Sequence, residues 1–126
     1  MATAKEDSIP VLLNSVQMRL SSSQRQLSIV RAQMSNRIRE AKMQELTIEQ
    51  LKGLGNETRV YKAVGKMFMR EDFDDVLAEA YRKRDQAMEE TQMLEKKSSF
   101  YEKEATEAKS HLTDLVKSIE KASTPP

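Results

Sequence analysis

The stretch that decides the fold lies in the middle of the chain and reads Asn56-Glu57-Thr58-Arg59-Val60-Tyr61-Lys62-Ala63-Val64-Gly65-Lys66-Met67-Phe68-Met69-Arg70. Residues typical of β-strands stand on both sides of Val64-Gly65, which is the pattern of a β-hairpin. A loop at Val64-Gly65 pairs Tyr61 with Phe68. The same register pairs Val60 with Met69, and both pairs are favourable across two strands. The register stays open, because Val64 is poorly suited to the positive φ of a type I′ turn.

A helix through the same stretch is the alternative, because four apolar residues there also recur at helical spacing: Val60, Val64, Met67 and Phe68. The residue types and Gly65 favour the hairpin. A lone two-stranded hairpin is marginally stable in water and leaves both edges open for pairing. Since the chain offers no third strand, we expect the missing strands to come from other subunits.

Outward from the hairpin, the chain contains two long stretches without a helix breaker. All three glycines (53, 55 and 65) lie in the middle, and the three prolines (10, 125 and 126) lie near the ends. Both stretches, 11–52 and 66–124, are rich in good helix formers. The sequence therefore predicts two long helices, one on each side of the hairpin.

The second stretch carries a heptad seam, with apolar residues spaced alternately three and four apart. Its fourteen positions are Leu77, Ala80, Arg84, Ala87, Thr91, Leu94, Ser98, Tyr101, Ala105, Ala108, Leu112, Leu115, Ile119 and Ala122. This spacing predicts a left-handed coiled coil. A helix of this length would extend roughly 70 Å at ~1.5 Å per residue, which no compact domain of this size accommodates.

The first stretch carries a less regular seam, formed by Leu13, Val16, Leu20, Ser23, Leu27, Val30, Met34, Ile38 and Ala41. The step from Met34 to Ile38 is four residues where three is due, and it predicts a local change in the supercoil. Ser8 is a candidate N-cap. We expect this helix to end near Glu45-Leu46.

A capping-box pattern at Thr47-Ile48-Glu49-Gln50 then predicts a short new helix, which Gly53 and Gly55 would end. The expected organisation is a coiled-coil helix over 8–46, a short helix with the oligomerisation hairpin over 47–70, a second coiled-coil helix over 71–122 and a tail over 123–126. The fold class is mainly α, with two antiparallel helices joined by the hairpin.

The composition excludes several classes of protein. The chain has 126 residues, 33% of them charged, with 5% aromatic residues, no Cys and a net charge of +1. Without Cys it has no disulfide framework and no thiol chemistry, and the single His111 speaks against His-based catalysis. No run approaches the ~20 apolar residues of a membrane span, and the N-terminus lacks the apolar region of a signal peptide. We expect a protein that is not an enzyme, needs no metal or other cofactor and does not bind membranes.

Charge is unevenly distributed along the chain. Residues 1–50 hold seven basic and five acidic groups, residues 51–70 hold five and one, and residues 71–126 hold nine and fourteen. A basic first helix beside an acidic second helix suits antiparallel pairing. Because exposed ion pairs are each worth ~0–1 kcal/mol, they set the register more than the stability.

The sequence of the central segment resembles that of a known family. The string Asn56-Glu57-Thr58-x-x-Tyr61-Lys62-x-Val64-Gly65-Lys66-Met67-Phe68 is similar to the hairpin segment of the β-type prefoldin subunits, the eukaryotic ones above all. With the flanking helices, the resemblance covers roughly residues 8–122. The coiled-coil parts are unspecific by themselves, whereas the hairpin string between two helices is fairly specific.

The resemblance implies a cytoplasmic co-chaperone. Prefoldin is a heterohexamer of two α-type and four β-type subunits, whose hairpins assemble into a β-barrel that carries six coiled-coil arms. The implied partners are the other five subunits, unfolded clients such as actin and tubulin, and the group II chaperonin, with no nucleotide cofactor. The residues implied in oligomerisation are Val60, Tyr61, Val64, Gly65, Met67, Phe68 and Met69.

The ends of the two helices are the implied client-binding site. In an antiparallel hairpin the chain termini meet at the open end, where exposed aliphatic side chains can hold an unfolded chain through non-directional burial. The candidates are Ile9, Val11, Leu12, Leu13, Leu115, Val116 and Ile119. The alternative is that they form the last layers of the coiled-coil core, which is favoured for Val16 and Leu112 and disfavoured for Ile9, Val11 and Val116.

Three other functions compete with this interpretation. A structural coiled-coil adaptor in a tethering or cytoskeletal complex would explain the helices, but it needs no intermolecular sheet. Nucleic-acid binding would use Arg19, Arg25, Arg31, Arg37 and Arg39, whose spacing of roughly six residues drifts around the helix and forms no compact basic face. An enzyme is disfavoured, because no set of nucleophile, base and orienting residue can be assembled.

Overall fold

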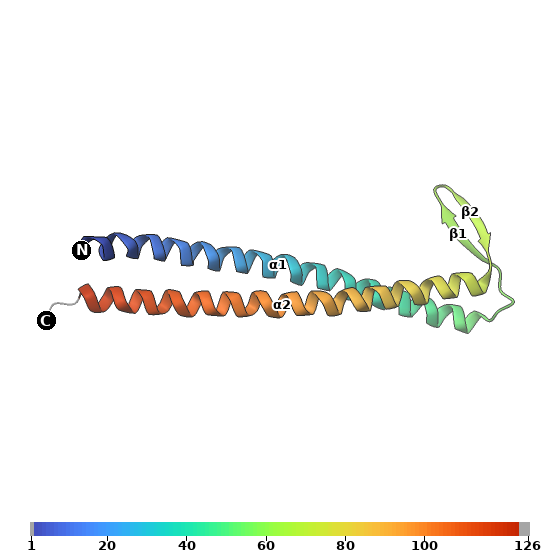
Figure 1. The fold of residues 1–126 in the computed structure, drawn as a ribbon. Helices are drawn as coiled ribbons and strands as arrows, with labels where there is room; N and C mark the ends of the chain where they lie inside the picture. Colours follow the sequence, from blue (N-terminus) through green and yellow to red (C-terminus); the bar gives the residue numbers. More distant parts are fainter. Residues whose placement is uncertain (1, 124–126) are drawn as a thin grey trace. The chain divides into compact units, whose positions relative to one another are not determined.

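The computed structural model describes residues 2–123, with side chains described for residues 9–122. The elements are α1 (Ala2–Leu54), β1 (Val60–Val64), β2 (Met67–Glu71) and α2 (Phe73–Ser123), in that order (Figure 1). The prediction of a mainly helical chain with a central antiparallel hairpin is confirmed, and a helix through the hairpin stretch is ruled out. The expected tail beyond Ser123 lies outside the described residues.

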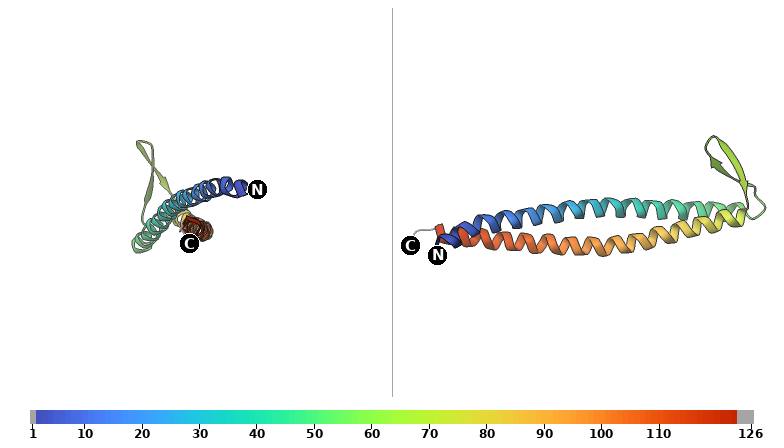
Figure 2. Two further views of the ribbon diagram at one scale, coloured as in Figure 1. Left: turned by 90° about the vertical axis from the view of Figure 1, so that its left-hand side faces the viewer. Right: turned by 45° about the horizontal axis from the view of Figure 1, so that its top comes forward.

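The chain forms two compact units, each built from a segment of both helices. Unit 1 comprises Met1–Ala32 with Glu95–Pro126, and unit 2 comprises Gln33–Leu94, which includes the hairpin. In unit 1 the Arg31 guanidinium lies 2.7 Å from the Glu102 carboxylate, and Arg19 lies 3.7 Å from Glu107. Since the earlier residue of α1 meets the later residue of α2, the two helices run antiparallel there, as Figure 2 also shows.

Unit 1 buries a regular heptad seam on both helices. On α1 the buried and half-buried seam residues are Leu13, Val16, Leu20, Ser23, Leu27 and Val30; on α2 they are Ser98, Tyr101, Ala105, Ala108, Leu112, Leu115 and Ile119. Ala108 is completely buried, and a side chain this small lets two helices approach closely. Ala122, the last predicted seam position, is exposed instead.

Unit 2 continues the seam, but through different residues of α1 than predicted. Met34, Arg37, Ala41, Gln44, Ile48 and Leu51 are buried or half-buried, opposite a seam on α2 that keeps every predicted position from Leu77 to Leu94. Ile38 is 39% exposed, while Arg37 takes the seam position. The predicted slip between Met34 and Ile38 is therefore wrong, and the spacing of three and four continues without interruption.

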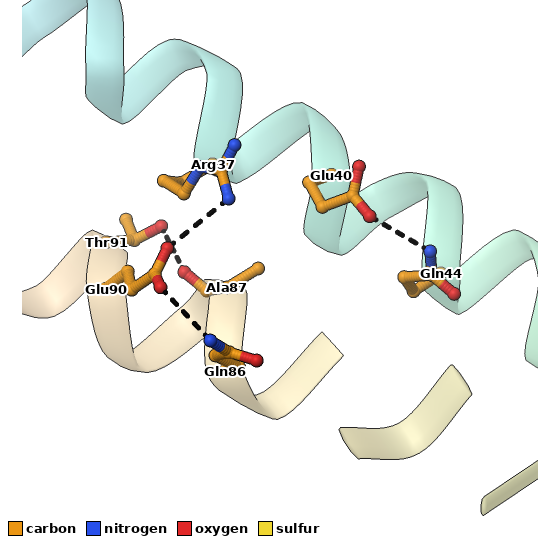
Figure 3. A network of polar contacts seen from close by, with 7 residues as sticks. All are labelled: Arg37, Glu40, Gln44, Gln86, Ala87, Glu90 and Thr91. Carbon is orange, nitrogen blue, oxygen red and sulfur yellow. Dashed lines mark hydrogen bonds and ion pairs between the residues drawn. The ribbon is translucent and has the colours of Figure 1, made fainter. Parts of the chain in front are cut away.

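The chemistry of arginine explains how it replaces an isoleucine in the seam. Its aliphatic stem can cover apolar surface while the charged head stays near water. The Arg37 Nη1 donates to Glu90 Oε2 at 3.3 Å, and Gln86 donates to the other oxygen of Glu90 at 3.4 Å (Figure 3). Glu90 thus pairs with the guanidinium at the edge of the seam, where the Arg37 side chain remains 42% exposed.

The first helix is also longer at both ends than the sequence analysis expected. It begins at Ala2 rather than after a cap at Ser8, and it includes Pro10. It passes through Glu45-Leu46 to Leu54, so the expected break and the separate short helix are wrong. Thr47 donates its hydroxyl to the Met43 carbonyl at 2.9 Å, a bond typical of a helix interior and not of an N-cap. Burial of Ile48 and Leu51 explains why the helix continues, since both extend the seam.

Candidate functional site

The hairpin loop consists of Gly65 and Lys66, one residue later than the loop the sequence analysis favoured. Gly65 has φ +63°, and among the described residues only glycines have positive φ. Positive φ at the first loop residue alone is the pattern of a type II′ turn, which prefers glycine at that position. Val64 thereby stays in β1, and the conflict between its branched side chain and the turn disappears.

The register follows from this loop. Val64 pairs with Met67, Ala63 with Phe68, Lys62 with Met69, Tyr61 with Arg70 and Val60 with Glu71. The predicted pairing of Tyr61 with Phe68 and of Val60 with Met69 is therefore wrong by two residues. Because side chains alternate with a period of two, such a shift moves no residue to the other face. Tyr61 and Phe68 remain on one face as diagonal neighbours.

Both faces of the hairpin are open to solvent. One face presents Tyr61, Ala63, Phe68 and Arg70, and the other presents Val60, Lys62, Val64, Met67, Met69 and Glu71. Phe68 is 73% exposed, Met67 71% and Tyr61 58%, and only Val60 and Glu71 at the strand ends are half-buried. Large apolar side chains left in water on both sides of a two-stranded sheet are typical of a surface that a partner covers.

Both edges of the hairpin are open as well. In an antiparallel ladder closed by a two-residue loop, Val64 and Met67 exchange hydrogen bonds, and so does every second pair after them. The backbone groups of Tyr61 and Ala63 then point outward from β1, and those of Phe68 and Arg70 point outward from β2. Outside its helices and strands, the described chain contains two backbone hydrogen bonds, Thr58 to Gly55 and Val76 to Asp72, and neither reaches these edges.

The junctions with the helices hold the hairpin within unit 2. After α1 ends at Leu54, Gly55 adopts φ +85°, a left-handed conformation that ends helices. The Thr58 hydroxyl donates to the Leu54 carbonyl at 2.8 Å. On the other side Phe73 is buried at the first turn of α2, and Lys62 of β1 lies 3.7 Å from the Glu79 carboxylate. These contacts position the strands without covering their faces.

The seven residues proposed for client binding lie near the helix ends in unit 1 and fall into two groups by burial. Ile9, Leu13, Leu115 and Ile119 are half-buried; the last three are seam residues, and Ile9 lies four residues before Leu13, which extends the spacing of the seam. Val11, Leu12 and Val116 are exposed. The expectation of exposure holds for Val11 and Val116 and fails for Ile9, while Val16 is a core residue as expected. The exposed group therefore presents most of the accessible aliphatic surface at these helix ends.

Ion pairs between the helices engage most of the arginines considered for nucleic-acid binding. Arg19, Arg31 and Arg37 each pair with a glutamate of α2, as the division of charge along the chain predicted. Arg25 and Arg39 are exposed and stand fourteen residues apart along α1, one in each unit. Glutamates therefore neutralise three of the five candidate arginines, and the described surface of α1 presents no concentrated basic face.

The described residues hold little that resembles a catalytic or metal centre. Within residues 2–123 no three His, Cys, Asp or Glu side chains gather closely enough to bind a metal ion. His111 is exposed. Over the described residues, neither helix combines the length and the apolar character that crossing a membrane requires.

Sequence reasoning missed two features of the coiled coil. The Arg37–Glu90 layer could have been found by following the heptad step from Met34 to residue 37 instead of to the nearest apolar residue. The second is a pair of cations around Tyr81, with Lys52 Nζ 5.3 Å and the Arg84 guanidinium carbon 4.9 Å from the ring centroid. The i, i+3 spacing of Tyr81 and Arg84 indicates their contact, but the position of Lys52 could not be predicted because it comes from the other helix.

The sequence and the fold are both similar to those of prefoldin subunits. A sequence model of the prefoldin subunit family matches residues 14–119. The probable prefoldin subunit 1 of Schizosaccharomyces pombe is 31% identical over 108 residues, which cover 86% of this chain and 96% of that protein. The probable prefoldin subunit 1 of Caenorhabditis briggsae is 25% identical and covers 80% and 88%. The crystal structure of the prefoldin beta subunit from Thermococcus strain KS-1 has a similar fold, with a TM-score of 0.55, 24% identity and coverage of 94% and 97%.

Proposed function

The chain belongs to the prefoldin subunit family, and we propose that it is a β-type subunit, of the kind represented by subunit 1, in a heterohexameric co-chaperone. Members of the family are chaperone subunits and not enzymes. In this proposal the hairpin joins a β-barrel with two α-type and three further β-type subunits. The complex captures unfolded proteins such as actin and tubulin without ATP, and delivers them to the group II chaperonin in the cytosol.

The exposure of the hairpin is the observation that carries the proposal. Its strands present large apolar side chains on both faces and unpaired backbone groups on both edges. An isolated hairpin of this kind is marginally stable, and open edges invite pairing with strands of other chains. Insertion into a closed barrel would satisfy both edges and cover the inward face. A structural adaptor needs none of this.

Client capture is assigned to the exposed aliphatic residues of unit 1. Val11 and Leu12 lie nine and ten residues after the start of α1, and Val116 lies seven residues before the end of α2, all outside the seam. Their small combined area supports weak binding only, at ~25 cal/mol per Å² of buried apolar surface. Several arms that bind one client together would supply affinity through avidity. Weak contacts also permit release to a chaperonin.

The experiment combines assembly with suppression of aggregation. The chain is co-expressed with the five other types of prefoldin subunit, and the purified complex is tested for suppression of the aggregation of unfolded actin. The variant Val11→Ser/Leu12→Ser/Val116→Ser should assemble normally, because none of the three side chains is in the seam. It should suppress aggregation severalfold less well, since five other arms remain.

A matched control separates the helix ends from apolar surface in general. Met43, Leu46 and Met88 are equally exposed but belong to unit 2, and their triple substitution by Ser should leave suppression unchanged. Equal loss in both triple variants would show that clients bind along the arms. Failure of the unmodified chain to enter a hexamer would refute the proposal and favour an adaptor.

A further inference from the structure

Two strongly exposed methionines stand next to each other on one face of the hairpin. Met67 is 71% exposed and Met69 is 57% exposed. Both belong to β2, and side chains two residues apart on a strand point to the same face. Val60 and Val64 lie on this face as well, so four of its six residues are apolar. It is called the methionine face below.

The methionines are the only sulfur-containing residues of the chain, because it has no cysteine. Oxidants react most readily with methionines that are open to solvent. Met34 is half-buried in the seam, whereas Met18, Met43 and Met93 are about as exposed as the hairpin pair. These three lie on the helices outside the seam, so their oxidation alters no surface that packs within the arm.

Hydrogen peroxide converts a methionine thioether into a sulfoxide in one step. A sulfur lone pair attacks one peroxide oxygen, the O–O bond breaks and an S–O bond forms, while the second oxygen leaves as water with both protons. The sulfur thereby loses two electrons, and the peroxide gains them. The product is a polar side chain in place of an apolar one. Burying a polar group without a hydrogen-bond partner is unfavourable.

The methionine face offers a sulfoxide little compensation for burial. Its one side chain with hydrogen-bond donors is Lys62, which pairs with Met69 across the hairpin and already lies 3.7 Å from the Glu79 carboxylate. A strand added beside β2 would bring its own side chains within ~5 Å of Met67 and Met69, because Cβ atoms directly opposite on neighbouring strands are this close. The oxidation state of the two sulfurs therefore acts at the point where a neighbouring strand packs.

We propose that Met67 and Met69 form a reversible oxidation site that controls assembly: as thioethers they permit the hairpin to enter an intersubunit sheet, and as sulfoxides they prevent it. This inference rests on the proposed assembly through the hairpin and adds a regulation to it. Methionine sulfoxide reductases, which use a thiol as the reductant, restore the thioethers. Neighbouring strands shield the two sulfurs once the sheet has formed, so peroxide acts on chains that have not yet assembled.

The test compares the affinity of the oxidised and the untreated chain for the other subunits. The isolated chain is treated with hydrogen peroxide, and peptide mass spectrometry measures sulfoxide at each methionine. Met67 and Met69 should oxidise faster than Met34. After removal of peroxide, titration into a complex of the other subunits should show affinity reduced at least roughly tenfold, the effect of one poorly paired polar group in a buried surface. Sulfoxide reductases with dithiothreitol should restore the affinity.

Two variants locate the effect on the hairpin. Met67→Leu/Met69→Leu keeps apolar side chains of similar volume but cannot be oxidised there, so its affinity should survive peroxide. Met18→Leu/Met43→Leu/Met93→Leu removes helix methionines that are 65%, 58% and 63% exposed, and it should lose affinity as the wild type does. Circular dichroism of each oxidised chain should show unchanged helicity, which excludes unfolding of the arm as the cause.

Several results would overturn the proposal. Undiminished affinity of a wild-type chain that carries both hairpin sulfoxides would remove the role of oxidation, and a loss that reductases do not reverse would remove its reversibility. Retained affinity in the oxidised triple variant would place the effect on the helices, even if the hairpin variant itself assembled poorly. By contrast, an untreated wild-type chain that enters no hexamer refutes the proposed function, and the regulation with it, before any peroxide is added.

Discussion

Phe68→Ala should separate the stability of the chain from its assembly. The Phe68 side chain is 73% exposed, so truncation should change the free energy of unfolding of the isolated chain by less than about 0.5 kcal/mol. Phe side chains bury 150 Å² or more when fully covered. Covering most of that area in an intersubunit sheet at ~25 cal/mol per Å² is worth about 3 kcal/mol. The affinity for the remaining subunits should then fall roughly a hundredfold.

Phe100→Ala is the matched control for this prediction. Phe100 is 57% exposed but belongs to α2 in unit 1, where its ring makes an edge-to-face contact with Tyr101 at a centroid distance of 5.4 Å. Losing this contact should cost the isolated chain about 0.5–1.5 kcal/mol and leave subunit affinity unchanged. The two substitutions should therefore have opposite effects on stability and on assembly.

The measurements are urea denaturation of each isolated variant, followed by circular dichroism, and titration of each variant into a complex of the other subunits. Wild-type affinity for Phe68→Ala would refute the assignment of the exposed hairpin face to the interface. A large loss of helicity in the same variant would show that Phe68 supports the chain's own fold, contrary to its exposure.

Three substitutions elsewhere follow from the same structure. Ala108→Leu adds three carbons at a fully buried seam position, and overpacking should lower the free energy of unfolding by about 1–3 kcal/mol in urea denaturation. Unchanged stability would contradict close approach of the helices in unit 1. Arg37→Leu replaces a half-exposed ion pair by an apolar seam residue and should be neutral or stabilising by about 1 kcal/mol in the same assay. A loss of several kcal/mol would show that the polar layer holds the register of the coiled coil. Gly65→Val places a branched residue at φ +63° and should weaken subunit binding through strain of about 1–2 kcal/mol, while Gly65→Asn should retain most of the binding measured by titration.

Much of this architecture could be predicted because it depends on local patterns. The heptad spacing of α2 identified thirteen of its fourteen seam positions as buried or half-buried, and glycines confined to the centre located the hairpin. The faces of the hairpin were also predictable, since alternation along a strand is independent of the exact register. The aliphatic residues at the helix ends were recognised as a group, but their division between seam and surface was not.

The determinants that sequence alone supplied were the two helices, the heptad period, the charge asymmetry and the apolar, basic hairpin. Tertiary structure decided which residues occupy the seam, because the facing helix sets the phase: Arg37 packs and pairs with Glu90, while the more apolar Ile38 faces solvent. It also decided the end of α1, since burial of Ile48 and Leu51 carries the helix past an N-cap motif. The hairpin register depended on one backbone angle, positive at Gly65, which moves Val64 out of the loop and into the strand. The seam and the end of α1 were choices between local alternatives, and the free energy of contacts distant in sequence selected one of them, whereas the register was decided by the backbone of the turn itself.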